Sequence, residues 1–400
     1  MDIVKINSSK LAGDVTVPPS KSAAHRALIC SFLSGGGSVK PIIDSNDMKA
    51  TVGVINALEN NQDTLDCIES GSTLRFMIPV AAALGKNVTF TGQGSLLKRT
   101  LGEYLELLPK HNVNIESSGY LPAEISGKLT NGSYEVSGDV SSQYITGLLM
   151  ALAGIDGDSA VILKTPLQSK PYVDMTVKVM ADFGVHITET EFGYLIHGNQ
   201  KYNQIDYIVE GDWSHAAFFL VAGAIGGGVR VSGLDMDSTQ GDKEIIQVLE
   251  RFGAKAEVRD GKIVCNKGEL IGCEVDAQNI PDLVPIIAVL AAFSKGTTVI
   301  KNAQRLRFKE SDRIESVVYN LKRIGAEVDE TDDGMIIKGG CKLHHAKLKG
   351  FNDHRIVMAF SIAALFLDGE TEVDDALSIN KSYPQFFEDY NRLGGKANVI

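Results

Sequence analysis

A phrase of about 25 residues recurs six times along this 400-residue chain, and a repeat constrains a fold more strongly than any single motif. Each copy is typical of a strand, a polar turn, a very apolar helix, and then a glycine and another strand. Successive copies lie about 70 residues apart, except for a first interval of about 50. The polar turns that open the six helices are anchored by Ser22, Ser72, Ser142, Ser214, Asp282 and Asp353.

Most copies continue with a second helix that is amphipathic, followed by a polar hairpin. In the fifth copy, Ile314 and Val317 fall at helical spacing, and Gly325 is placed to end the helix. Alternating apolar residues around Asp333-Gly334 predict the hairpin. The unit is therefore strand–helix–strand–helix–strand–strand, with the first helix buried and the second exposing one face. The first copy is short and has lost most of its hairpin.

Six such units predict an α/β (α+β) protein with two similar domains of three units each. The length of 400 residues favours the same division, because a single core rarely grows to that size. An open solenoid, in which each repeat contacts only its neighbours, is the alternative architecture.

Composition limits the classes of function. The formal charge is −11, with 50 acidic and 39 basic residues, which opposes general binding to nucleic acid. No apolar run approaches the roughly 20 residues of a membrane helix, and no export leader is visible, so we expect a cytoplasmic protein. The five cysteines lack the close spacing of a zinc or redox site, and no histidine has acidic partners at ligand spacing. We predict neither a metal nor a cofactor.

Basic residues gather where helices are expected to begin. Ser, Thr, Asn and Asp at these positions are explained as helix caps. Cations at these positions are not explained as helix caps, because a helix N-terminus is already positive. A buried cation beside it is costly unless an anion neutralises it. Lys21, Arg26, Arg75, His354 and Arg355 lie at the starts of the apolar helices, and Lys98, Arg99, Lys170, Lys309, Arg313 and Lys381 lie where the chain enters the second helices. This pattern predicts a polyanionic ligand.

Eight motifs then identify a resemblance that spans nearly the whole chain. In order they are SKSAAHRAL, SGSTLRF, SSQYITGLLM, SKPY, IPD, RFKESDR, NDHR and NKSYPQFF. Together they resemble the enolpyruvyl transferase family, and within it the 5-enolpyruvylshikimate-3-phosphate synthases. The resemblance implies two similar domains of three βαβαββ units, an inside-out α/β barrel, with the active site in the cleft between them. It places residues 20–209 in one domain, and 1–19 plus 210–400 in the other.

The resemblance also implies the reaction and the residues that perform it. The enolpyruvyl group of phosphoenolpyruvate would pass to the 5-hydroxyl of shikimate 3-phosphate through a tetrahedral intermediate that releases phosphate, a step of aromatic amino-acid biosynthesis. Residues matching the shikimate 3-phosphate site are Lys21, Ser22, Arg26, Ser141, Ser142, Gln143, Ser169, Tyr172, Asp282, Arg305 and Lys309. Residues matching the phosphoenolpyruvate site are Lys21, Gly71, Arg99, Gln143, Arg313, Arg355 and Lys381. The implied catalytic residues are Asp282, Glu310, Lys21 and His354, acting in a monomer without nucleic-acid or membrane partners.

Structural explanations compete with several of these assignments. Asp282 after Pro281 has the position of a plain helix cap, Glu310 is spaced to pair with Arg313, and His354 is equally well explained as a structural histidine. The sequence leaves open which group makes each proton transfer. Three other functions also compete: enolpyruvyl transfer to UDP-N-acetylglucosamine, a non-enzymatic anion-binding repeat protein, and an RNA-end-processing enzyme on a related fold.

Overall fold

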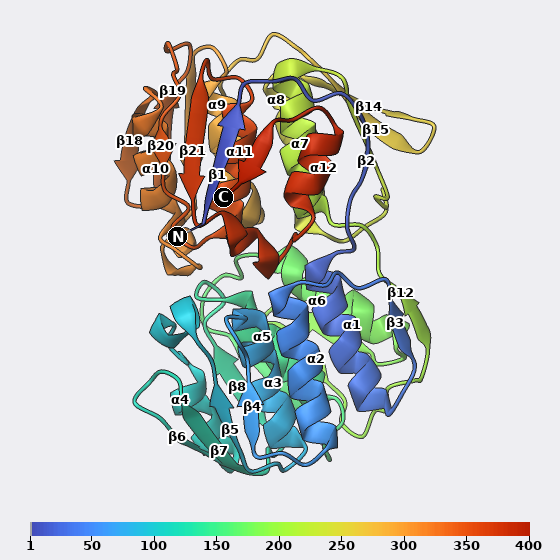
Figure 1. Ribbon diagram of the computed structural model, residues 1–400. Helices are drawn as coiled ribbons and strands as arrows, with labels where there is room; N and C mark the ends of the chain where they lie inside the picture. Colours follow the sequence, from blue (N-terminus) through green and yellow to red (C-terminus); the bar gives the residue numbers. More distant parts are fainter. Residues whose placement is uncertain (1) are drawn as a thin grey trace. The chain divides into compact units, whose positions relative to one another are not determined.

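The computed structural model describes residues 2–400, and the chain divides into two compact units. One unit is Met1–Pro18 together with Glu210–Ile400, and the other is Pro19–Val209. The chain therefore passes from one unit to the other twice, after Pro18 and after Val209. Figure 1 follows both passages by colour along the sequence.

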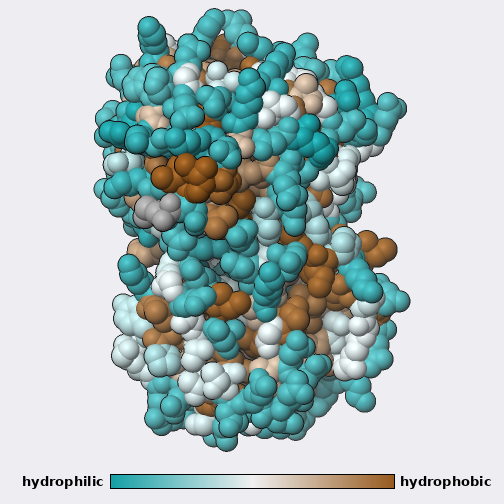
Figure 2. All heavy atoms as spheres, viewed as in Figure 1, coloured by the Kyte–Doolittle hydropathy of each residue, from teal (hydrophilic) through white to brown (hydrophobic). Residues whose placement is uncertain are grey.

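Six apolar helices form the centre of the two units, three in each. They are α1 (Lys21–Ser34), α3 (Gly71–Ala83) and α5 (Ser142–Leu152) in one unit, and α7 (Trp213–Gly226), α9 (Val284–Ala292) and α11 (His354–Ala364) in the other. Every residue of α9 and of α11 is buried, as expected for helices that are apolar nearly all round. The visible face in Figure 2 is mainly hydrophilic, with separate hydrophobic patches.

The second helix of each copy is shorter or amphipathic. These helices are α2 (Asn46–Glu59), α4 (Tyr104–Leu107), α6 (Lys170–Asp182), α8 (Ile245–Arg251), α10 (Arg313–Arg323) and α12 (Phe386–Arg392). In α10, Ile314 and Val317 are buried while Glu315 is exposed, and Gly325 follows with φ +90°. The amphipathic helix and its glycine stop are confirmed.

Five four-stranded sheets repeat one pattern in the described chain: a parallel pair of strands continued by two antiparallel strands. Their orders are β4 (Thr64–Asp66), β5 (Val88–Thr91), β7 (Ala123–Gly127), β6 (Val113–Glu116); β8 (Ser133–Val136), β9 (Ser159–Leu163), β11 (Gly193–Ile196), β10 (Ile187–Thr190); β2 (Gly13–Thr16), β13 (Val229–Ser232), β15 (Lys262–Asn266), β14 (Lys255–Arg259); β16 (Glu274–Asp276), β17 (Thr297–Lys301), β19 (Gly334–Lys338), β18 (Glu327–Thr331); and β20 (Lys347–Leu348), β21 (Glu370–Asp374), β1 (Ile3–Asn7), β22 (Ala397–Val399).

The sixth sheet has only two strands, which agrees with the short first copy of the repeat. Strand β3 (Ser38–Lys40) pairs in parallel with β12 (Asp206–Ile208), although they are far apart in sequence. The leading strand of the first copy, β2, pairs instead with β13 of the fourth copy. The two copies that flank the passages between units have thus exchanged their leading strands. In the last sheet, β1 lies between β21 and β22, so both ends of the chain complete the sixth copy (Figure 1).

The predicted turn of the fifth hairpin was wrong by one residue. Thr331 pairs with Gly334, so the turn is Asp332-Asp333 and Gly334 is the first residue of β19. A side chain at Gly334 would place its Cβ 1.9 Å from the Ile300 carbonyl oxygen. The glycine is therefore required by the close approach of β17, not by the turn.

Side-chain caps open five of the six central helices. Ser20, Ser70, Ser141, Asp212 and Asp353 each accept a hydrogen bond from a backbone N–H of the first turn. The exception is α9, which follows the 3₁₀ turn η4 (Pro281–Leu283) and has no side-chain cap. The interpretation of Asp282 as a helix cap is therefore wrong.

Several cations that the sequence placed at helix entries close 3₁₀ turns instead. These turns are η1 (Gly94–Lys98), η5 (Gln304–Phe308) and η6 (Ala376–Lys381), and they end at or just before Lys98, Lys309 and Lys381. The carbonyl end of a turn favours a positive charge, so these lysines carry no dipole penalty. Lys170 and Arg313, in contrast, are the first residues of α6 and α10. Among residues 2–400, no helix is long and apolar enough to cross a membrane.

Candidate active site

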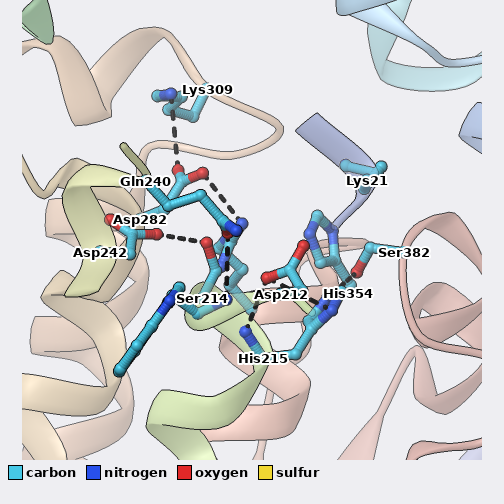
Figure 3. A network of polar contacts seen from close by, with 12 residues as sticks. Lys21, Asp212, Ser214, His215, Gln240, Asp242, Asp282, Lys309, His354 and Ser382 are labelled. Atoms are coloured by element: carbon cyan, nitrogen blue, oxygen red, sulfur yellow. Dashed lines mark hydrogen bonds and ion pairs between the residues drawn. The ribbon is translucent and has the colours of Figure 1, made fainter. Parts of the chain in front are cut away.

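Asp282 is the centre of an ion-pair cluster in the unit formed by Met1–Pro18 and Glu210–Ile400. Arg313 Nη1 donates to its Oδ1 at 2.8 Å, and Arg355 Nη2 donates to its Oδ2 at 2.9 Å. Lys309 Nζ lies 3.6 Å from Oδ1 (Figure 3). The fold positions these groups at the starts of three neighbouring elements: η4 for Asp282, α10 for Arg313 and α11 for Arg355.

Electrostatics keep the Asp282 carboxylate ionised. Burial by itself raises its pKa, but Arg355, Lys309 and Arg313 outweigh burial and hold the pKa of Asp282 well below its usual range. Burial also lowers the pKa of Lys309, against the opposite effect of Asp282. The cluster therefore holds a half-buried carboxylate in its charged form, which is the state of a group that accepts a proton or binds a hydroxyl.

Arg313 is enclosed by three carboxylates. Its side chain is 1% exposed, and it donates to Asp282, to Glu310 Oε2 at 2.6 Å, and through Nε to Asp353 Oδ2 at 2.8 Å. The i,i+3 pairing of Glu310 with Arg313 expected from spacing is confirmed. Burial lowers the pKa of Arg313, but Asp353, Glu310 and Asp282 together raise it above its ordinary value. All three guanidinium nitrogens thus contact carboxylates within the unit.

The remaining candidates of this unit contact the backbone near the same elements. Lys381 Nζ donates to the Asn352 carbonyl oxygen at 2.7 Å, just before the cap of α11. Arg305 Nη2 donates to the Gln278 carbonyl oxygen at 2.7 Å, in the segment that leads to η4. His354 is the first residue of α11 and is buried, with Nδ1 3.9 Å from Asp353 Oδ1.

In the unit Pro19–Val209, a second set of candidates surrounds the starts of α1, α3 and α5. Lys21 Nζ donates to Asp47 Oδ2 of α2 at 2.6 Å, and both side chains are largely buried. Gln143 of α5 accepts from Arg75 Nη1 at 2.7 Å and donates to Ser72 Oγ at 3.0 Å. The Arg75 and Ser72 side chains of α3 therefore fix both ends of the Gln143 amide.

Gly71 permits a close approach between a helix N-terminus and an arginine. It is the first residue of α3, and an added Cβ would lie 2.3 Å from Arg99 Nη1. The guanidinium of Arg99 thus packs directly against the backbone at the positive end of a 13-residue helix. Two positive groups in contact form an anion-binding arrangement, which suits a phosphate or carboxylate.

Arg26 connects its own helix, α1, to α6. Nε donates to Thr176 Oγ1 of α6 at 2.8 Å, Nη1 to the Ser22 carbonyl oxygen at 2.6 Å, and Nη2 to the Tyr172 carbonyl oxygen at 2.9 Å. Burial lowers the pKa of Arg26 to about 10. Its contacts hold Ser22 and Tyr172 at fixed positions.

The serines that the motifs match to the shikimate 3-phosphate site lie at helix starts. Ser141 caps α5 through the Gln143 N–H, Ser142 is the first residue of that helix, and Ser169 precedes α6 with φ +55°. A non-glycine residue in the left-handed region is uncommon and is found often at ligand-binding positions. Ser169 is also buried.

Comparison with known proteins decides the family. A family model described as EPSP synthase (3-phosphoshikimate 1-carboxyvinyltransferase) matches residues 6–64 and 53–390. The chain belongs to the EPSP synthase family. It is 42% identical to the 3-phosphoshikimate 1-carboxyvinyltransferase of Clostridium novyi, with 99% of this chain and 98% of that protein covered. The protein of the same description from Clostridium kluyveri is 43% identical, with 100% and 99% covered.

Solved structures of EPSP synthases have the same fold. The EPSP synthase from Acinetobacter baumannii superposes with a TM-score of 0.82 at 25% identity, and each chain is covered completely. The enolpyruvyl transferase NikO from Streptomyces tendae has a TM-score of 0.80 at 16% identity, which shows a shared fold. The predicted α/β fold of two three-unit domains and the resemblance to the enolpyruvyl transferases are therefore confirmed.

The residues that the EPSP synthase motifs nominated are divided between the two units. Asp282, Arg305, Lys309, Glu310, Arg313, His354, Arg355 and Lys381 lie in one unit, and Lys21, Ser22, Arg26, Gly71, Arg99, Ser141, Ser142, Gln143, Ser169 and Tyr172 lie in the other. Asp353 and Asp47 were missed as partners of Arg313 and Lys21. Asp353 lies within the NDHR motif, where its position at a helix start is explained by an anchoring role. No local pattern marks Asp47. Among residues 2–400, no group of three His, Cys, Asp or Glu side chains is arranged to hold a metal ion.

Proposed function

We propose that this member of the EPSP synthase family transfers the enolpyruvyl group of phosphoenolpyruvate to the 5-hydroxyl of shikimate 3-phosphate. The observation that carries the proposal is the half-buried, ionised Asp282 held between Arg313 and Arg355, with Glu310 bound to the same Arg313. Relatives about 40% identical over their full length carry the corresponding name. A carboxylate beside a second carboxyl, both within a cationic cluster, suits a reaction that moves protons on an anionic substrate.

The reaction requires balanced proton transfers. The 5-hydroxyl loses a proton as its oxygen bonds to C2 of phosphoenolpyruvate, and the methylene carbon gains a proton to give the tetrahedral intermediate. Phosphate then leaves, and the new methyl group returns a proton to restore the double bond. Asp282 and Lys21 are the candidates for the hydroxyl proton, and Glu310 is the candidate for the methylene proton. His354 is the fourth residue assigned to these steps.

The binding roles follow the charges. Arg99 against the N-terminus of α3, together with Lys21, Gln143, Arg313, Arg355 and Lys381, would hold phosphoenolpyruvate. The hydroxyls near Arg26, with Tyr172, Arg305, Lys309 and Asp282, would hold shikimate 3-phosphate. Since these residues come from both units, we propose that the units are the two domains of the enzyme and that both contribute residues to substrate binding. We propose a monomer that acts in the cytoplasm.

Asp282→Asn tests the proposal. The substitution keeps the shape of the side chain and removes its charge, so phosphate release from phosphoenolpyruvate in the presence of shikimate 3-phosphate should fall by about 10²-fold to 10⁴-fold. Asp276→Asn is the matched control, because Asp276 is exposed on β16. Equal rates in the two variants would remove Asp282 from the mechanism.

A further inference from the structure

Asp242 is a buried acid that no proposed step uses. It lies in the 3₁₀ turn η3 (Gly241–Glu244) and is 3% exposed. Ser214 Oγ of α7 donates a hydrogen bond to its Oδ2, as Figure 3 shows. Its Oδ1 has no hydrogen-bond partner among residues 2–400. A carboxylate offers about four acceptor positions, so a buried one with so few partners is poorly solvated when charged.

Three charged groups from other elements interact electrostatically with Asp242. They are Asp282 of η4, Arg355 of α11 and Asp212, the cap of α7. On its own turn, Lys243 donates to the carbonyl oxygens of Met236 and Ser238. Burial, and then the charge of Asp282, raise the pKa of Asp242 to about 7, while Arg355 and Ser214 act in the opposite direction.

The position of Asp242 links two groups of the proposed site. Arg355 and Asp282 form a 2.9 Å ion pair, and both interact electrostatically with Asp242. When Asp242 is neutral, Asp282 is the main carboxylate that balances Arg355. When Asp242 is charged, it adds a second negative charge beside Arg355 and weakens the attraction of that guanidinium for an anion.

We propose that Asp242 is a positioning residue whose charge sets how strongly Arg355 attracts the anionic enolpyruvyl donor, with Ser214 fixing the Asp242 carboxyl. The inference rests on the proposed function, because it assigns Arg355 to phosphoenolpyruvate. It adds a residue outside every motif that carried the family resemblance, since Asp242 lies in the segment between the fourth helix start and the fifth.

The test compares the KM for phosphoenolpyruvate of the full-length protein and of Asp242→Asn between pH 6 and pH 8.5. Asparagine stays neutral throughout, whereas Asp242 gains charge as the pH rises. The ratio of the unmodified protein's KM to the variant's should therefore rise by about threefold to tenfold across this range, as expected for one partly screened charge. The substrate phosphate also titrates near pH 6, but it affects both proteins equally and cancels in the ratio. The kcat of the two proteins at pH 6 should agree within about twofold.

Ser214→Ala supplies an independent variant. Ser214 stabilises the charged form of Asp242, so its removal should move the rise in KM to higher pH. Asp237→Asn is the matched control, because Asp237 is exposed five residues earlier in the same segment, and its profile should follow that of the unmodified protein. Thermal unfolding of each variant establishes that it is folded. If Asp242→Asn is not folded, the pH at which KM rises in Ser214→Ala tests the inference in its place.

Three results would overturn the inference. A KM ratio that does not change with pH in active, folded protein would remove Asp242 from substrate attraction and leave the proposed function intact. An unshifted profile in Ser214→Ala would do the same. Absence of phosphate release by the unmodified protein with any acceptor would overturn the proposed function, and this inference with it.

Discussion

Arg313 is a buried cation that pairs with three carboxylates, those of Asp282, Glu310 and Asp353. The RFKESDR motif identified Arg313 and Glu310, and the spacing predicted their ion pair, which the structure contains at 2.6 Å. No local pattern indicates that Asp353, 40 positions away, binds the Nε atom of the same guanidinium. Local spacing predicts contacts within one turn, whereas contacts between helix starts depend on how the repeats pack.

Asp353→Ala should be strongly destabilising. The carboxylate is buried, caps α11 through the Arg355 N–H, and pairs with Arg313 at 2.8 Å. Its removal leaves a buried guanidinium short of one partner, which costs about 3–5 kcal/mol of unfolding free energy. Asp312→Ala is the control: Asp312 caps α10 at 3.0 Å and pairs with Arg307 in a more exposed position, where an ion pair adds little, so its loss should cost about 1 kcal/mol. Equal losses in denaturant unfolding would show that the buried ion pair contributes nothing beyond a cap.

The stability of Asp242→Asn should depend on pH with a defined sign. An unfolded aspartate ionises near pH 4, but the folded chain keeps Asp242 protonated until about pH 7. Between these values the folded state binds more protons, so this group lowers the stability of the unmodified protein as pH rises. The variant should therefore gain stability relative to the unmodified protein from pH 4 to pH 7, by about 3 kcal/mol, and the gain should level off above pH 7. Calorimetry across this range measures it, and a constant difference would contradict the assigned pKa.

At the scale of elements, the pattern of apolar residues was sufficient to place the buried helices and the alternating hairpins. The sequence did not predict that the entry segments with Lys98, Lys309 and Lys381 would be 3₁₀ turns, because short turns have no periodicity to detect. It also misassigned the role of Gly334. A glycine after polar residues indicates a turn, but the approach of β17 is a contact between strands that no local pattern records.

Gly147 tests the packing of α3 on α5. A Cβ at this position would lie 2.5 Å from the Arg75 carbonyl oxygen and 2.7 Å from Tyr104 Oη, so Gly147→Ala forces the two helices apart. We expect a loss of about 2–3 kcal/mol, typical of overpacking. Gly53 in α2 is exposed and has nothing within 4 Å, so Gly53→Ala should instead stabilise the protein by up to about 1 kcal/mol. We expect the denaturant midpoint to fall in Gly147→Ala and to rise in Gly53→Ala. If both variants were stabilised, that result would contradict the close approach of α3 and α5.

At the scale of the whole molecule, the repeat predicted six units, and the structure contains five complete sheets and one reduced sheet. The exchange of β2 and β12 between copies is a consequence of the chain passing twice between units. The family resemblance, not the repeat period, suggested those passages. A period reports that units are alike but does not report which strand completes which sheet.

The unit Pro19–Val209 should fold as an isolated fragment. It is continuous in sequence, and all the strands of its three sheets lie within it. The fragment should therefore show one cooperative unfolding transition by circular dichroism. Residues 210–400 alone should not, because β1 and β2 would be missing from two of their sheets. Cooperative unfolding of both fragments would contradict the interleaved arrangement.

The most direct test of the central claim is phosphate release from phosphoenolpyruvate by the full-length protein, measured with shikimate 3-phosphate and separately with UDP-N-acetylglucosamine. The same assay is repeated with Glu310→Gln, and with Glu327→Gln as the matched control, because Glu327 is exposed on β18. We predict release that requires shikimate 3-phosphate, falls by at least about 10²-fold in Glu310→Gln, and is unchanged in Glu327→Gln. Release only with the nucleotide sugar, or with neither acceptor, would contradict the proposed reaction.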